Sequence, residues 1–215
     1  GIAYSSNWAD GVVAVDIGAK KHKEADRSKS QFNPLLAKAG QGSPSNPQTL
    51  AEMKDPTGRN HAAFPYLSES TGKFYIIGGD ENFPWGVMAT KGKPSNPRGA
   101  YHFLDFTDPE NPKEDAIYEV PEAGSHNLWI HGDMLLAGNY QGGLRVVDIS
   151  GDLLGDIYKQ GREIAHYLSY HKDGRIANAP MVWGAQPYKD YIFFSDMNSG
   201  LYCVELVEEP NNSTD

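Results

Sequence analysis

The strongest constraint on the fold is a motif that recurs four times along the chain. Each copy has an Asn or Asp, a short polar loop, a Gly and then a strand of alternating apolar and polar residues. The copies are "SSNWADGVVAVDIG" (5–18), "GGDENFPWG" (78–86) continued by "GAYHFLDFTD" (99–108), "AGNYQGGLRVVDIS" (137–150) and "FSDMNSGLYCVELV" (194–207). Gly99 and Gly143 of this motif lie 44 residues apart, the usual length of one four-stranded propeller blade. The spacing predicts a repeat protein.

Further strand candidates surround each motif. "LRVVDI" and "VVAVDI" alternate with a period of two, which is typical of strands and not of helices. Apolar runs rich in aromatic and β-branched residues occupy 74–80, 134–140 and 191–197. Short strand candidates precede them at 61–67, 126–131 and 180–188, and fourth strands are expected at 116–120 and 163–170. The sequence therefore predicts an all-β fold, a β-propeller of four-stranded antiparallel blades, as one domain over residues 1–215.

Three segments interrupt or follow the repeats. A polar insertion spans about 19–60, and within it "NPQTLAEMK" (46–54) predicts a helix capped by Ser45 or Asn46. A second insertion spans 86–98, and the tail at 208–215 has the composition of a flexible end. We expect the first insertion to be a long excursion over the surface between blades.

The number of strands predicts about three and a half blades: the back part of one, two complete, and three strands of another. Closed propellers usually need four to eight blades. We therefore expect a partial ring, completed either by an N-terminal half missing from this chain or by a partner chain. The chain begins within a blade and without a Met, which favours a missing half.

Composition narrows the function classes. The formal net charge is −9, and the basic residues are scattered, which argues against nucleic acid as a partner. Cys203 is the only cysteine, so no internal disulfide can form, and its apolar strand predicts a core position. No apolar run approaches the roughly 18 residues of a spanning helix, and no P-loop, dinucleotide fingerprint or nucleophile elbow is present.

The strand order brings one set of possible metal ligands to a single rim. The strand at 61–67 begins where the antiparallel strand at 74–80 ends, so His61 is expected near Asp80 and Glu81. His126 opens the corresponding strand of the next repeat. Imidazole and carboxylate groups suit a divalent transition metal or acid–base chemistry. His61 and Glu81 are the best pair, because no turn geometry accounts for Glu81.

A second set could line the rim of a ligand channel, and it has a simpler alternative explanation. The set is Asn7, Asn139, Tyr140, Trp183 and Asp196. Asn7, Asp80, Asn139 and Asp196 each precede a hairpin turn, where an Asx side chain bonds its own backbone two residues on. The two strand-opening histidines could likewise bond a neighbouring loop. Both interpretations remain open from the sequence.

Other polar and aromatic residues are expected to be structural or solvated. No shared spacing links His22, His131, His166 and His171, which predicts an exposed surface position for each. Trp8, Trp85, Trp129 and Trp183 are expected mainly between blades, with a pocket rim as the alternative. No calcium-loop pattern of spaced oxygen ligands is present.

The chain resembles the LVIVD repeat family, in which an alternating strand ends in Val-Asp and leads into an Asp-Pro-x-Asn-Pro loop. "GVVAVDIG", "GLRVVDIS" and above all "YHFLDFTDPENPKEDAIYEV" carry the resemblance, which covers most of 1–18 and 60–207. The resemblance implies an exported bacterial β-propeller, periplasmic or secreted, commonly without a defined reaction. We therefore expect a non-catalytic protein-binding or scaffold module of a larger, possibly membrane-associated assembly. The alternative is a metal-binding or enzymatic propeller using His61, Asp80, Glu81 and His126.

Overall fold

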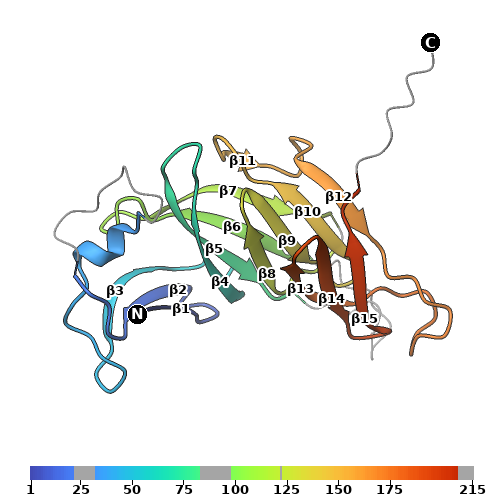
Figure 1. Cartoon of the computed structure of the whole chain (residues 1–215), viewed down its shortest axis with the longest axis horizontal. Coiled ribbons are helices and arrows are strands. Elements are labelled where there is room, and N and C mark those ends of the chain that lie inside the picture. The colour runs from blue at the N-terminus through green and yellow to red at the C-terminus, as the bar shows by residue number, and fades with distance from the viewer. Residues whose placement is uncertain (22–31, 83–97, 122, 208–215) are drawn as a thin grey trace, which may run out of the picture.

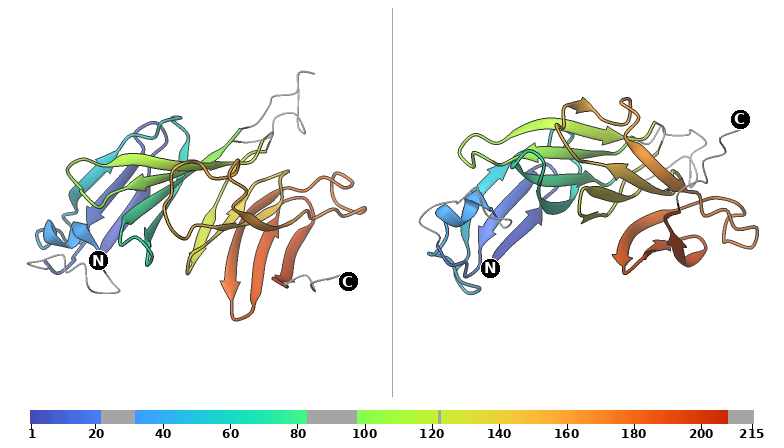
Figure 2. Two further views of the ribbon diagram at one scale, coloured as in Figure 1. Left: turned by 90° about the horizontal axis from the view of Figure 1, so that it is seen from above. Right: turned by 45° about the horizontal axis from the view of Figure 1, so that its top comes forward.

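The computed structural model describes residues 1–21, 32–82, 98–121 and 123–207. Within these ranges the chain forms four small sheets that follow one another along an open arc (Figures 1 and 2). The first and last sheets lie at opposite ends of the molecule, so the described sheets do not close into a ring (Figure 1). The all-β fold class is confirmed. No helix of the described ranges is long and apolar enough to cross a membrane.

The first sheet contains β1 (Ile2–Ser6), β2 (Val12–Asp16) and β3 (Gln48–Met53), in that order. The predicted helix at 46–54 is wrong, because this segment is a strand that pairs antiparallel with β2. The open edge of β2 offers a row of unpaired backbone groups, and tertiary pairing overrides local helix propensity. A helical turn of this region is the 3₁₀ segment η1 (Pro34–Ala37), which Asn33 caps by accepting from Leu35 N.

The first insertion is therefore not a surface excursion over its whole length. Phe32, Leu35 and Ala39 are buried against the first two sheets. Residues 22–31 of this insertion, residues 86–97 of the second and the tail at 208–215 lie outside the described residues.

The second sheet contains β4 (Asn60–Leu67), β5 (Phe74–Asp80), β6 (Ala100–Asp105) and β7 (Lys113–Glu119), all antiparallel. A two-residue strand, β11 (Gly155–Asp156), adds to β7 in parallel and was not expected. The third sheet contains β8 (Leu128–His131), β9 (Met134–Gly138), β10 (Leu144–Asp148) and β12 (Glu163–Tyr167). The predicted fourth strands at 116–120 and 163–170 correspond to β7 and β12.

The fourth sheet contains β13 (Val182–Tyr188), β14 (Tyr191–Asp196) and β15 (Gly200–Glu205). No described strand follows β15, so its outer edge is unpaired within this part of the chain. Cys203 lies on this strand and is exposed, so the predicted core position is wrong. The residues of β15 alternate as predicted, but among the described residues no further sheet covers the face that carries Cys203.

Among the described residues, three hydrophobic cores fill the spaces between neighbouring sheets. The largest lies between the second and third sheets and includes Phe103, Tyr118 and Val147. Adjacent residues of β10 serve different cores, because Val146 packs toward the fourth sheet and Val147 toward the second. An inner sheet is thus buried on both faces, which is why its strands are apolar at consecutive positions.

The aspartates that end the alternating strands cap the following turn. Asp105 Oδ1 accepts from Thr107 N at 2.8 Å, and Asp148 Oδ1 accepts from Ser150 N at 2.8 Å. Asp16 makes more hydrogen bonds than these two aspartates. Its two carboxylate oxygens accept from five backbone N–H groups, those of Gly18, Ala19, Gly40, Gln41 and Gly42. The recurring Val-Asp pattern therefore has a turn-forming role.

A candidate metal centre at the inner rim

Three inner strands begin at the same rim of the arc. β4 contacts β1 and β8, and β8 contacts β13, so these strands line the inner side of the arc. His61 lies near the start of β4, His126 lies just before β8, and Trp183 lies near the start of β13. Their rings form a row. The His61 and His126 ring centroids are 4.3 Å apart. The His126 and Trp183 ring centroids are 5.3 Å apart, and the planes of these two rings are nearly parallel.

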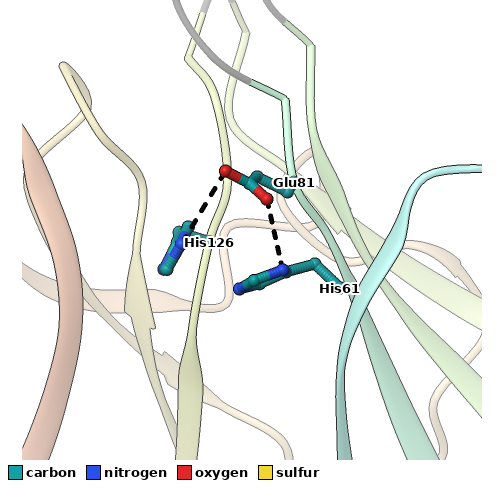
Figure 3. Close-up of side chains that lie close together, drawn as sticks. All are labelled: His61, Glu81 and His126. Atoms are coloured by element: carbon teal, nitrogen blue, oxygen red, sulfur yellow. Dashed lines mark ion pairs between the residues drawn. The ribbon is translucent and has the colours of Figure 1, made fainter. Parts of the chain in front are cut away.

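Glu81 completes the cluster from the end of β5. Its Oε2 lies 3.2 Å from His61 Nδ1, and its Oε1 lies 3.9 Å from His126 Nε2 (Figure 3). The carboxylate is directed at both imidazoles, which come from different sheets. The backbone N–H of Glu81 donates to Arg59 O at 2.9 Å, which anchors the residue beside the start of β4.

His126 is held in one orientation by a backbone carbonyl. Its Nδ1 lies 3.0 Å from Trp183 O, so Nδ1 must carry the proton and Nε2 is left with a free lone pair toward Glu81. Burial, together with the neighbouring His61, lowers the pKa of His126 and favours the neutral ring. A neutral imidazole oriented through its other nitrogen is the usual state of a metal-binding histidine.

Gly138 makes this orientation possible. A Cβ at this position would lie 2.5 Å from Trp183 O, so only glycine lets β9 approach the start of β13 this closely. Tyr140, two residues later, is buried and donates its hydroxyl to Glu81 Oε1 at 3.0 Å. Burial, followed by the nearby Glu81 carboxylate, raises the pKa of Tyr140, so the phenol remains a donor.

The geometry fits a metal ion. His61, Glu81 and His126 each offer a ligand atom, and these atoms lie within 4.8 Å of one another. Ligands about 2.1 Å from a tetrahedral ion lie about 3.4 Å apart, and the Glu81 oxygens lie 3.2 Å and 3.9 Å from the two imidazole nitrogens. The His61 and Glu81 side chains are 29% and 25% exposed, so an ion and a further ligand could reach the cluster from solvent.

Asp80 does not join this cluster, contrary to the prediction. Successive residues of a strand point to opposite faces, so Asp80 turns away from Glu81 into the space between the first two sheets. There its Oδ2 accepts from Ala100 N at 3.1 Å and its Oδ1 from Thr57 Oγ1 at 2.7 Å. Its neighbours are Asp55 and His102, which form a second cluster with it.

The residues predicted for the channel rim divide into two groups. Tyr140 contacts Glu81 and Trp183 contacts His126, so both adjoin the candidate metal centre. Asp196 instead caps its own turn, accepting from Asn198 N at 2.7 Å and Ser199 N at 2.9 Å, as the simpler explanation predicted. Asn7 bonds Gly11 O across its turn, and Asn139 is fully buried with its amide on Ala137 O. These three lie outside the two clusters of possible metal ligands found among the described residues.

The structure confirms the predicted exposure of three histidines, but only one described tryptophan packs between sheets. His131, His166 and His171 are exposed, whereas His22 and Trp85 lie outside the described residues. Trp129 is half-buried and packs on Phe64 of the neighbouring sheet, with centroids 5.3 Å apart. Trp8 and Trp183 are 53% and 40% exposed, so neither is buried between sheets.

A cavity of about 610 Å³ adjoins the cluster of His61, Glu81 and His126, on the inner side of the arc. Its lining includes His61, Phe64, Trp129, Trp183 and Gln186, from β4, β8 and β13. A mostly apolar wall with a few polar groups is typical of small-molecule sites. The cavity therefore adjoins the candidate metal centre through His61 and Trp183.

Sequence reasoning missed His102, Asp55 and Thr57 of the second cluster. His102 lies on β6 between aromatic residues in "AYHFLD", and a histidine in a fully buried strand could have been recognised as needing polar partners. Asp55 and Thr57 lie in the loop after β3, within the insertion, where no periodic pattern points to a site.

Comparisons with known proteins leave the family open. No protein-family model matches the chain, and no curated protein matches it. Among solved structures, the chain is similar to "Crystal structure of the computationally designed Ika4 protein", with 10% identity, a TM-score of 0.48, and coverage of 96% of this chain and 86% of that one. It is also similar to "AfRom2 CNH domain", with 10% identity, a TM-score of 0.40, and coverage of 98% and 59%.

Proposed function

We propose that this protein binds a divalent transition metal ion through His61, Glu81 and His126 at the inner rim of its arc of sheets. The observation that carries the proposal is the convergence of these three ligand atoms within 4.8 Å from three separate segments of the chain. Turn formation alone does not explain this arrangement. The carboxylate of Glu81 faces the imidazoles of His61 and His126.

The donor set indicates the class of metal. Two imidazoles and one carboxylate suit Zn²⁺ or Fe²⁺ better than Ca²⁺ or Mg²⁺, which prefer oxygen ligands. Three protein ligands leave at least one position for water or a further ligand. A metal held in this way can polarise an oxygen atom or acidify a bound water, and the adjoining cavity would hold the rest of that ligand.

The wider setting is proposed from the repeat. The blade-sized sheets and the Val-Asp strand ends support a β-propeller of the LVIVD type, present here as a partial ring. The remaining sheets would come from a further part of the same protein or from a partner chain. The resemblance also supports a location outside the cytoplasm, periplasmic or secreted.

Metal binding is tested by titrating the metal-free chain with Zn²⁺ and Co²⁺ in a metal-buffered solution. We expect one equivalent of Co²⁺ to give the intense visible bands of a low-symmetry site, which Zn²⁺ then displaces. The variant H61A/H126A should lose these bands. His131→Ala is the matched control, since it removes an exposed imidazole from β8 and should leave them unchanged. Equal binding by H61A/H126A and the wild type would overturn the proposal.

Protein binding is a second candidate, favoured by the surface of the fourth sheet. Leu201 is 75% exposed on β15, and Val207, which follows this strand, is 70% exposed. Apolar side chains beside an unpaired strand edge are suited to contact another protein. A photo-crosslinker at position 201 should capture a defined partner in the native cell, and one at the exposed Glu69 should not. Identical labelling at both positions would count against this function.

A further inference from the structure

A second cluster of metal-ligand type lies buried between the first two sheets. Asp55 comes from the loop after β3, Asp80 from the end of β5 and His102 from the middle of β6. Their side chains are 2%, 2% and 5% exposed, so the cluster is shielded from solvent. Thr57 holds the two carboxylates in place: Asp55 Oδ1 accepts from Thr57 N at 2.8 Å, and Asp80 Oδ1 accepts from Thr57 Oγ1 at 2.7 Å.

Two buried atoms of this cluster have no hydrogen-bond partner. They are Asp55 Oδ2 and His102 Nε2. Leaving a buried polar atom unpaired costs about 1–3 kcal/mol, and more for a charged group, so native structures rarely tolerate it without a reason. Two such atoms among three facing side chains indicate that a bound species completes the cluster.

The distances within the cluster match those between ligands of one ion. His102 Nε2 lies 3.4 Å from Asp80 Oδ1 and 3.8 Å from Asp55 Oδ1. The atoms are too far apart or too poorly aligned for good hydrogen bonds. They are close to the separation of about 3.4 Å that a tetrahedral ion with ligand bonds of about 2.1 Å requires.

The other nitrogen of His102 is already engaged. Its Nδ1 lies 2.5 Å from Glu114 Oε2, on the neighbouring strand β7. A carboxylate that accepts from one ring nitrogen orients the ring and raises the basicity of the other nitrogen, as behind many metal-binding histidines. Glu114 is therefore a positioning residue, which directs His102 Nε2 toward the two aspartates.

A protonated His102 is the competing explanation. Burial by itself would lower the pKa of His102, but the nearby carboxylates of Asp80, Glu114 and Asp55 raise the pKa to about 10. Such an imidazolium would offset part of the negative charge. It would still leave Asp55 Oδ2 without a donor, which a cation would bind directly.

We propose that Asp55, Asp80 and His102 form a second, buried site for a divalent cation of the Zn²⁺ or Mn²⁺ class. One imidazole and two carboxylates suit these ions, and with only two carboxylates and a nitrogen donor the cluster fits Ca²⁺ poorly. The ion would connect the loop after β3 to β5 and β6. It would thus join the first sheet to the second, and its main effect would be on stability.

The two sites meet at neighbouring residues of β5 and the turn that follows it. Asp80 contributes to the buried site and Glu81 to the rim site, because the two side chains point to opposite sides of the strand. The buried site does not depend on the proposed function at the rim, since the two clusters share no ligand. Their occupancies can be separated by mutation.

The experiment counts bound metal in a chain whose rim site has been removed. H61A/H126A is dialysed against buffered Zn²⁺, and separately against Mn²⁺, and bound metal is measured by inductively coupled plasma mass spectrometry. We expect about one equivalent of at least one of these ions. Adding Asp55→Asn, which nearly preserves the shape of this buried side chain, should remove it. Asp190→Asn is the matched control, because it makes the same substitution at an exposed aspartate in the turn between β13 and β14, and it should keep the equivalent.

Two further measurements guard against misfolding as an explanation. Glu114→Gln should weaken the affinity of the buried site about 10–100-fold while the chain stays folded by circular dichroism. Zn²⁺ or Mn²⁺ should raise the Tm of H61A/H126A but not that of the same chain carrying Asp55→Asn. A folded H61A/H126A chain that binds neither ion, with both His102 nitrogens protonated by NMR in their presence, would overturn this site.

Other patterns of binding separate the two proposals. One equivalent of metal that Asp55→Asn removes and H61A/H126A keeps would support the buried site and overturn the rim site. One equivalent that H61A/H126A removes and Asp55→Asn keeps would do the reverse.

Discussion

The imidazole rings of His61 and His126 lie with their centroids 4.3 Å apart, although His61 lies on β4 of the second sheet and His126 lies just before β8 of the third. Each occupies the start of the inner strand of its sheet, and the stacking of neighbouring sheets brings the two starts together. Glu81 lies between them, with one carboxylate oxygen 3.2 Å from His61 Nδ1 and the other 3.9 Å from His126 Nε2. A repeat thus produces a site because equivalent positions of adjacent repeats become neighbours in space.

Tyr140→Phe tests how the rim site is supported. The hydroxyl donates to Glu81 Oε1 at 3.0 Å, so its removal frees the carboxylate to rotate away from the histidines. We expect Zn²⁺ affinity at the rim to fall about 10-fold or more, as is usual for the loss of an outer partner of a metal ligand. Competition against a chelator measures it. Tyr202→Phe loses a comparable bond, to Ser199 Oγ, and should have wild-type affinity.

Asp16→Asn should destabilise the chain near neutral pH, because Asp16 accepts from five backbone N–H groups of two loops. Hydrogen bonds from Gly42, Gly18 and Ala19 hold the pKa of Asp16 well below its ordinary value of 3.8. A lowered carboxyl pKa gives stability that is present above the unfolded pKa and lost as the pH falls toward the folded pKa.

The expected signature is therefore a pH-dependent difference between Asp16→Asn and the wild type. The gap in unfolding free energy, from urea denaturation, should be constant between pH 5 and 7 and should shrink below about pH 4. A gap that stays constant down to pH 2.5 would show that the charge of Asp16 contributes nothing.

Val146→Ala and Val147→Ala should both destabilise the chain, by about 2 kcal/mol each. The two side chains are 2% and 0% exposed and lie in different cores, so neither faces solvent. A sheet covered on one face would show the loss at only one of them. Val207→Ala, at a position that is 70% exposed, should change stability by less than about 0.5 kcal/mol. Chemical denaturation of the three variants measures this.

Cys203 should react with a thiol reagent in the folded chain. It is exposed on β15, whose outer edge is unpaired within the described residues. We expect full modification by Ellman's reagent within minutes, without denaturant, at a rate close to that of a free thiol. Slow reaction that accelerates in urea would mean that another segment covers this edge, which would count against the protein-binding candidate.

The sequence by itself determined the local elements. Alternation with a period of two, ended by Asn-, Asp- and Gly-rich turns, located most of the strands, because these signals act through backbone geometry over a few residues. It failed at β3, where isolated helix propensity was overridden by the open edge of β2. It also failed at Cys203, because burial depends on whether another sheet covers a strand.

The sequence alone located part of the candidate site, and the packing of the sheets decided the rest. The antiparallel pairing of 61–67 with 74–80 was enough to place His61 beside Glu81. The approach of His126 needed the stacking of two sheets, and the departure of Asp80 followed from which face of β5 it occupies. His102 and Asp55 became neighbours of Asp80 only through packing of β6 and of the loop after β3. Contacts within a hairpin join residues that are close in sequence, so strand pairing alone predicts them. Contacts between sheets join residues that are far apart in sequence, and they depend on how the sheets pack in three dimensions.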